Sequence, residues 1–208
     1  ILSLKCYPSV LDVEGEIDLA VVVVPAPFVA TVLEECGQKG VKGAIIITAG
    51  FREVGGEGIQ REREVIKIAR KYGMRLVGPN VLGIIDTISQ LNASFAAGMP
   101  RRGGIAFMSQ SGALCTSILD IAQAEDIGFS RFISLGNKAD IGEIDFIEAW
   151  ENDPHSRVIM AYLEGIADGA RFMEVARRVT RKKPIIAIKS GTTSAGSRAV
   201  SSHTGTLA

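Results

Sequence analysis

The chain has 208 residues, which is enough to bury one large hydrophobic core or two modest ones. Its 23 basic and 23 acidic residues balance, so its charge gives no reason to expect nucleic acid or an anionic membrane as a partner. Hydrophobic residues make up 47% of the sequence and aromatic residues only 6%, a composition typical of α/β layers with parallel strands.

The cysteines and the longest apolar run bear on location. Cys6, Cys36 and Cys115 are far apart and form no CxxC or metal-ligand spacing, so we predict no metal site. We interpret them as small buried residues in a reducing compartment, which predicts a cytoplasmic protein. The longest apolar run, residues 19–30, contains two prolines and is too short to span a bilayer.

The first half of the chain predicts three parallel strands connected by two helices. Strands are expected at 18–25, 43–50 and 74–80, and helices with apolar residues at helical spacing at 26–40 and 57–73. A nucleotide-binding sheet of this kind usually opens with a strand, a glycine-rich loop and a helix, and we find none before residue 18. We therefore expect a truncated domain in a fragment of a longer protein.

The second half repeats the alternation after a stretch of small residues, glycine and proline at 92–104, which predicts a linker. Strands are expected at 104–110, 129–136, 156–165 and 183–191, with helices at 112–126, 143–152 and 169–182. The pattern predicts a second α/β domain with a parallel sheet and a boundary near residue 100.

The turns that follow the second set of strands are rich in Ser, Gly and Asn, and they are expected to gather at one sheet edge, where ligands bind. One of them, "SQSG", joins a strand directly to a helix, whose first N–H groups lack internal partners. Small side chains at Ser109, Ser111 and Gly112 would let an anion approach these groups, which predicts a phosphate site. An ordinary serine N-cap is the alternative explanation.

Two further residues are candidates for chemistry at this edge. Glu164 follows an apolar strand, and His203 lies in a loop of small polar residues. A carboxylate that accepts the Nδ1–H of an imidazole leaves Nε2 free as a nucleophile, so the pair beside a phosphate site predicts phosphohistidine chemistry. A solvated strand-end carboxylate and a routine surface histidine are the alternatives, and the latter suits His155, in a proline turn, better.

Seven motifs then occur in order along nearly the whole chain: "VVPAPF", "ITAGF", "GPNVLGI", "MSQSGAL", "SLGNKADI", "YLEGI" and "SSHTGTLA". Through them the chain resembles the NDP-forming acyl-CoA synthetases, the superfamily that includes succinyl-CoA synthetase, and in particular the α part of ADP-forming acetyl-CoA synthetases. The resemblance implies a truncated Rossmann-like CoA-binding domain at 1–98 and a flavodoxin-like succinyl-CoA-ligase domain at 102–208. It also implies a ligase that interconverts acyl-CoA, ADP and phosphate with an acid, CoA and ATP through an acyl phosphate.

The resemblance also assigns site residues. His203 matches the histidine that is phosphorylated in the family, and Glu164 matches the carboxylate that holds it. The phosphate-binding helix start matches Ser109, Gln110, Ser111, Gly112 and Ala113. The segments that line CoA match Pro25, Thr48, Ala49, Gly50 and Asn80.

The chain departs from the family pattern in two places, because the glycine-rich loop of the CoA domain and the ATP-grasp domains are not found in it. The resemblance therefore implies an ATP-grasp (β) domain or subunit as partner, which would bind ATP or ADP with Mg²⁺, and an oligomeric enzyme. The other partners implied are an acyl-CoA and a small organic acid, and the fragment by itself is expected to be inactive.

Two other classes of function share parts of this sequence pattern. An NAD-dependent oxidoreductase would need GxGxxG and a ribose-binding acid, and neither occurs in the right context. An acyl-CoA-sensing regulatory module of a larger protein, such as an acetyltransferase, would share the fold and would not need the histidine. The joint presence of His203, Glu164 and "SQSG" favours the enzyme.

Overall fold

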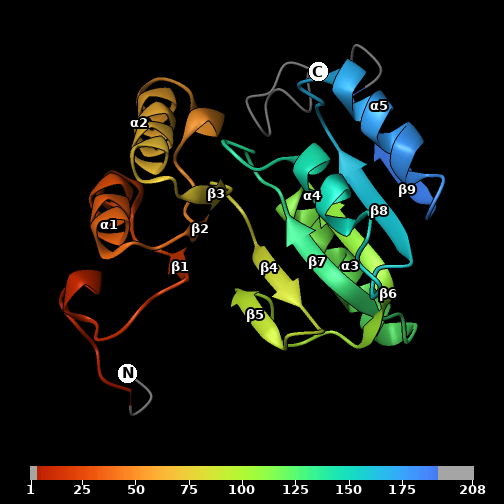
Figure 1. The fold of residues 1–208 in the computed structure, drawn as a ribbon, viewed down its shortest axis with the longest axis horizontal. Coiled ribbons are helices and arrows are strands. Elements are labelled where there is room, and N and C mark those ends of the chain that lie inside the picture. The colour runs from red at the N-terminus through yellow and green to blue at the C-terminus, as the bar shows by residue number, and fades with distance from the viewer. Residues whose placement is uncertain (1–3, 192–208) are drawn as a thin grey trace.

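The computed structural model of the chain describes residues 4–191 and contains two β-sheets with helices packed on them (Figure 1). The strands are β1 (Leu19–Val22), β2 (Gly43–Ile46), β3 (Arg75–Val77), β4 (Gly83–Asp86), β5 (Leu91–Ser94), β6 (Arg102–Ser109), β7 (Phe129–Ser134), β8 (Val158–Leu163) and β9 (Ile185–Lys189). The helices are α1 (Ala26–Lys39), α2 (Glu57–Tyr72), α3 (Gly112–Ala124), α4 (Glu143–Trp150) and α5 (Gly169–Val179), with short 3-10 helices η1 (Val10–Asp12) and η2 (Arg52–Val54). Every strand and helix predicted from the sequence is present.

The first sheet has the order β1-β2-β3, and all its strands are parallel. Helices α1 and α2 lie side by side on one face of it (Figure 1). The core beneath them contains Val22, Ile46 and Leu76 from the strands, and Leu33 and Val65 from the helices, all at most 3% exposed. The apolar runs that predicted these strands therefore supply one layer of the core.

The second sheet has the order β5-β4-β7-β6-β8-β9, in which β7, β6, β8 and β9 are parallel. The connection from β6 to β7 runs one way along the sheet, and the connections to β8 and β9 run the other way. Right-handed crossovers therefore place α3 on one face and α4 with α5 on the opposite face. Alternate residues of β6 serve the two cores, because Met108 packs under α4 and α5 whereas Phe107 stacks on Phe132 in the core under α3, with 4.8 Å between ring centroids.

Strands β4 and β5 form an antiparallel hairpin that we did not predict, and β4 pairs antiparallel with β7. The second sheet is therefore mixed, and the linker predicted at 92–104 begins inside β5. The strands have four residues each and carry polar side chains such as Asp86 and Asn92, so no long apolar run marks them. The chain thus passes from the first sheet to the second at residues 78–82.

None of the helices within residues 4–191 combines the length and the apolar character that crossing a membrane requires.

Candidate active site

The carboxyl ends of the parallel strands in the second sheet are joined to one another by backbone hydrogen bonds. The N–H of Leu135, just after β7, donates to the carbonyl of Ser109 at the end of β6 (2.7 Å). Gln110 N–H donates to Tyr162 in β8 (3.0 Å), and Ser190 N–H donates to Leu163 (2.9 Å). The predicted turns therefore lie together at one edge of the sheet, as the parallel arrangement requires.

The turn 109–113 has the geometry of a helix start open to a ligand. Ser111 is the N-cap of α3, and its Oγ accepts a hydrogen bond from Leu114 N–H (3.3 Å). The serine cap that was the alternative explanation is therefore present. For the N–H groups of Gly112 and Ala113, the structure records no acceptor among the residues it describes. A Cβ built on Gly112 would meet nothing within 4 Å, which leaves space for an anion in front of the helix.

Glu164, directly after β8, is 3% exposed, which does not fit a solvated strand-end carboxylate. Its backbone N–H and that of Gly165 donate to Oε1 of Gln110, at 2.7 Å and 3.0 Å. Gln110 is itself 3% exposed, and it belongs to the turn before α3. The candidate carboxylate and the candidate phosphate site are therefore linked by a side chain as well as by the sheet.

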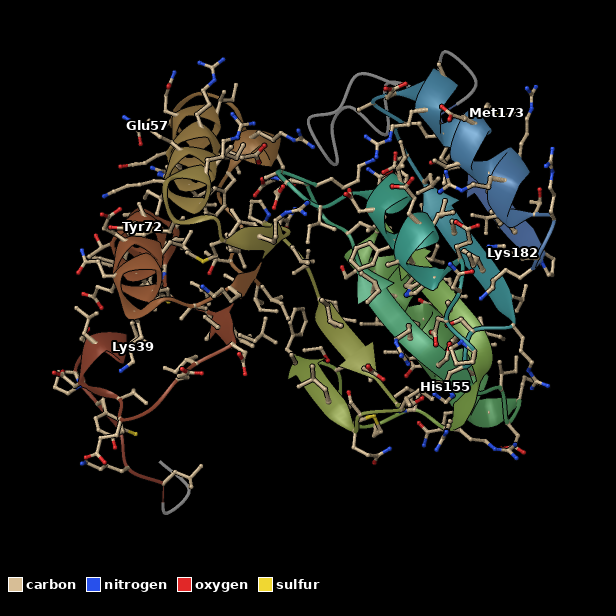
Figure 2. The ribbon with its side chains drawn as sticks, in the orientation of Figure 1. Lys39, Glu57, Tyr72, His155, Met173 and Lys182 are labelled. Carbon is tan, nitrogen blue, oxygen red and sulfur yellow. The ribbon has the colours of Figure 1, made fainter. Side chains whose placement is uncertain are left out.

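The two histidines fall in different places. His203, the predicted nucleophile, lies outside the described residues, so its position relative to Glu164 stays a prediction. His155 is exposed, and its N–H donates to Oδ1 of Asp153 (3.1 Å) within the turn before β8. Figure 2 shows it near the end of the sheet from which β8 starts, opposite the edge that carries Glu164.

The residues expected to line CoA also lie at strand ends, in the first sheet. Pro25 is the N-cap of α1, just beyond β1. Thr48 follows β2, and its Oγ1 donates to the carbonyl of Val24 (2.7 Å). Asn80 follows β3, has a positive φ of 63°, and donates its N–H to the carbonyl of Thr48 (3.0 Å). These contacts and strand ends bring together at one edge of the first sheet the residues predicted to line CoA: Pro25, Thr48, Ala49, Gly50 and Asn80.

The two sheet edges are joined by the loop 134–142, which contains the motif "SLGNKADI". The sequence placed it among the strand-end turns but did not indicate that it contacts the first domain. Asn137 N–H donates to Pro79 (2.9 Å), and Ala139 N–H donates to Gly78 (2.9 Å). Gly136 lies so close to this segment, with a φ of 54°, that a Cβ on it would be 2.3 Å from the Pro79 carbonyl oxygen. The loop therefore packs against the segment that leads from β3 into Asn80.

A buried polar cluster fixes the same loop to the first domain. The Nδ2 group of Asn137 donates to both Glu53 Oε2 (2.6 Å) and Glu62 Oε2 (2.8 Å). A guanidinium N–H of Arg52 donates to the Asn137 carbonyl, and Nε of Arg52 lies 3.4 Å from Glu62 Oε1. Burial raises the pKa of Glu62 above its ordinary value, in spite of Asn137 and Arg52.

Glu53 connects this cluster to the predicted CoA segment. Its Oε1 accepts hydrogen bonds from the N–H groups of Gly50 (2.6 Å) and Phe51 (3.1 Å). Burial acts to raise the pKa of Glu53, but these bonds and the one from Asn137 lower it below the ordinary value. The carboxylate of Glu53 therefore links Asn137 to the turn that follows β2.

A hollow of about 280 Å³ lies beside the loop 134–142, where the two domains meet. Its lining includes Arg52 and Lys138 but also four carboxylates: Asp140, Glu143, Asp145 and Asp168. Lys138 is already paired with Glu143 (2.7 Å), so the charge of the hollow does not favour an anionic substrate. Within residues 4–191 there is also no cluster of three His, Cys, Asp or Glu side chains that could hold a metal ion.

Comparison with known proteins finds a matching family for each half of the chain. Residues 102–208 match the family described as a succinyl-CoA ligase like flavodoxin domain, and residues 1–87 match a CoA binding domain. The chain is 53% identical over 208 residues to an ADP-forming acetate–CoA ligase of Methanocaldococcus jannaschii, covering 29% of that protein. It is 52% identical over 206 residues, or 99% of the chain, to the α subunit of ADP-forming acetate–CoA ligase II of Pyrococcus furiosus, covering 45% of it.

A solved structure is also similar. The dinucleotide forming acetyl-coenzyme A synthetase 1 of Ca. Korarchaeum cryptofilum, in complex with phosphate and ADP, superposes with a TM-score of 0.94 at 46% identity. The match covers all of this chain and 45% of that one. The chain therefore spans less than half the length of these relatives.

The fold and the matched ranges define a CoA-binding domain joined to a flavodoxin-like ligase domain. The chain belongs to the succinyl-CoA-ligase-like family, that of the NDP-forming acyl-CoA synthetases, as its motifs predicted. Its relatives there include the α parts of ADP-forming acetate–CoA ligases.

Proposed function

We propose that this chain is the CoA-binding and phosphoryl-carrying part of an ADP-forming acid–CoA ligase. The observation that carries the proposal is the joint position of Glu164 and the open start of α3 on one sheet edge, linked by Gln110. The names of the relatives support the reaction class, since they are ADP-forming acetate–CoA ligases.

The proposed reaction has three steps. Phosphate, held by the N–H groups at the start of α3, attacks the carbonyl of acyl-CoA. The C–S bond breaks, CoA leaves as the thiol, and an acyl phosphate remains. Nε2 of His203 then attacks phosphorus, the P–O bond to the acyl group breaks, and the acid is released as its carboxylate. The phosphoryl group finally passes from His203 to ADP and forms ATP.

Each side chain has a defined task in this scheme. Glu164 would accept the Nδ1–H of His203, hold the tautomer with Nε2 free, and stabilise the positive charge that develops on the ring. The dipole of α3 and the N–H groups of Gly112 and Ala113 would stabilise the phosphate oxygens. Pro25, Thr48 to Gly50 and Asn80 would line CoA at the neighbouring edge.

The proposed partner is an ATP-grasp domain or subunit, because the final step needs a nucleotide site that residues 4–191 give no sign of. The ADP in the Korarchaeum structure supports this expectation for that protein's longer chain. ATP or ADP with Mg²⁺ would bind there, and a small organic acid would be the second product of acyl-CoA cleavage. An oligomeric, cytoplasmic enzyme remains part of the proposal.

Labelling of the full-length protein tests the proposal. Incubation with radiolabelled ATP should give an acid-labile phosphoryl group that is lost in His203→Ala and retained in His155→Ala. Label that persists in His203→Ala and disappears in His155→Ala would contradict the assignment. A wild-type protein that binds acyl-CoA tightly but never takes up label would instead indicate the acyl-CoA-sensing module.

A further inference from the structure

The four polar backbone groups of Glu164 and Gly165 are all hydrogen-bonded to side chains. Both N–H groups donate to Oε1 of Gln110, at 2.7 Å and 3.0 Å. The carbonyl of Glu164 accepts from Nζ of Lys189 (2.8 Å), and the carbonyl of Gly165 accepts from Nζ of Lys138 (2.6 Å). Two donors and two acceptors are thus all satisfied without any regular secondary structure.

The three side chains come from three different parts of the chain. Gln110 lies between β6 and α3, Lys138 lies in the loop after β7, and Lys189 is the last residue of β9. Backbone groups after a strand are ordinarily satisfied by water or by a following helix. Here the residues that leave the strand are fixed instead by distant parts of the chain, so the position of Glu164 depends on the whole sheet edge.

The arrangement places costly groups in the interior. Gln110 is 3% exposed, and its Nε2 has no hydrogen-bond partner among the described residues. The side chain of Lys138 is 9% exposed and pairs with the almost fully buried Glu143. Burial lowers the pKa of Lys138 in spite of this pairing, and the charge of Glu164 is near enough to act on it. Buried amides and ammonium groups reduce stability unless they are paired. A sheet edge with only a structural role would therefore be more stable if it were built from apolar residues.

We propose that Gln110, Lys138 and Lys189 are positioning residues that fix the carboxylate of Glu164 for the histidine chemistry. This inference rests on the proposed function and adds residues to it. Gln110 has the central place, since it belongs to the turn that would hold phosphate and also fixes the turn that carries Glu164. Its side-chain oxygen Oε1 accepts hydrogen bonds from two N–H groups, which orients the amide and leaves Nε2 as a donor inside the site.

The physical reason is the tolerance of the reaction. A catalytic group has to be held within about 0.5 Å of its productive position, and a displacement of about 1 Å can reduce the rate about 100-fold. Glu164 has no helix to hold it, because α5 does not begin until Gly169. The three side chains supply that rigidity.

The experiment measures the rate at which His203 is phosphorylated in full-length protein with radiolabelled ATP. Gln110→Met keeps the length of the side chain and removes the acceptor, and Lys189→Met removes one donor at the end of an edge strand. Each should lower the rate about 10- to 100-fold. The matched control is Lys183→Met, since Lys183 donates to three carbonyls (Trp150, Asp153 and Ser156) away from this edge. It should lower the melting temperature and leave the rate unchanged.

A double-mutant cycle separates positioning from a general structural effect. If Gln110 acts through Glu164, then Gln110→Met should lose most of its effect on the rate in a Glu164→Gln background. Additive effects, or a wild-type rate in both Gln110→Met and Lys189→Met, would overturn the inference. Absence of label on His203 in the wild-type protein would be a failure of the proposed function instead, and can be recognised as such.

Discussion

At the scale of single residues, Glu164 is the side chain whose environment differs most from the bland expectation. The sequence left two possibilities, a solvated carboxylate at a strand end or a hydrogen-bond partner of a histidine. The residue is 3% exposed, which does not fit the first. The sequence suggested this residue in two ways, because Glu164 follows an apolar strand and lies in the motif "YLEGI". Gln110 and Lys138 lie in the motifs "MSQSGAL" and "SLGNKADI", but neither motif indicates that these side chains hold Glu164, and Lys189 lies in none of the seven motifs. Their contacts with Glu164 and Gly165 join parts of the chain that are distant in sequence.

Glu164→Gln tests whether its charge matters. The amide oxygen can still accept a hydrogen bond, but the interaction with a charged imidazole ring is lost. Loss of a charge-assisted hydrogen bond costs about 1.5–3 kcal/mol, so phosphorylation of His203 should slow roughly 10- to 150-fold. Ser111→Ala removes one cap hydroxyl and leaves the backbone donors in place, so it should slow the reaction less. A wild-type rate in Glu164→Gln would show that the carboxylate is structural.

Gly112→Val tests the proposed phosphate site at the start of α3. A Cβ at this position meets no neighbouring atom, so the protein should fold with its melting temperature little changed. The added side chain would occupy the space in front of the α3 N–H groups and should reduce phosphorylation at least as much as Glu164→Gln. Circular dichroism and the labelling rate check the two halves of this prediction. A variant that is phosphorylated normally would place the phosphate elsewhere.

At the scale of elements, the sequence predicted what depends on local pattern and missed what depends on pairing. The buried parallel strands and the amphipathic helices follow from apolar spacing within each segment. Hairpin β4–β5 is defined by its pairing with β7, its strands have only four residues each, and β5 overlaps the segment predicted as a linker. The loop 134–142 contains the motif "SLGNKADI", but the motif does not indicate that the loop contacts the segment leading into Asn80.

Gly136→Ala tests how tightly that loop is packed. Gly136 has a positive φ of 54°, and a Cβ would be 2.3 Å from a backbone oxygen, so we expect a loss of about 3 kcal/mol or more in the free energy of unfolding. The matched control is Gly40→Ala, where φ is also positive (87°) but a Cβ meets nothing within 4 Å. It should cost only about 1–2 kcal/mol. Equal losses in urea unfolding would mean that the loop yields easily.

At the scale of the whole molecule, Asn137 joins the two domains through Glu53 and Glu62, and this joint should respond to pH. Burial raises the pKa of Glu62 in the folded protein. The folded state then holds its proton more readily than the unfolded chain, so stability falls as the pH rises from about 4.5 through the raised value. The pKa of Glu53 is lowered, so its contribution is lost in the opposite direction, as the pH falls below about 4.5.

Glu62→Gln isolates the first effect. The amide can still accept from Asn137, but it does not titrate. The unfolding midpoint of the variant should therefore depend less on pH above 4.5 than that of the wild type, with the behaviour below 4.5 retained because Glu53 is unchanged. Unfolding curves taken across pH 3 to 8 check this. Parallel pH profiles for the two proteins above 4.5 would show that Glu62 does not titrate in that range.

The proposed reaction requires transfer of a phosphoryl group from acyl phosphate to one histidine, with CoA bound at one sheet edge and phosphate and Glu164 at the adjoining edge. The most direct measurement supplies the full-length protein with an acyl-CoA and radiolabelled inorganic phosphate, omits ADP, and locates the label by peptide mass spectrometry. We expect one phosphoryl group on His203, released CoA thiol in equal amount, and no label when the acyl-CoA is left out. Label on another residue, or CoA release without any phosphorylated histidine, would contradict it.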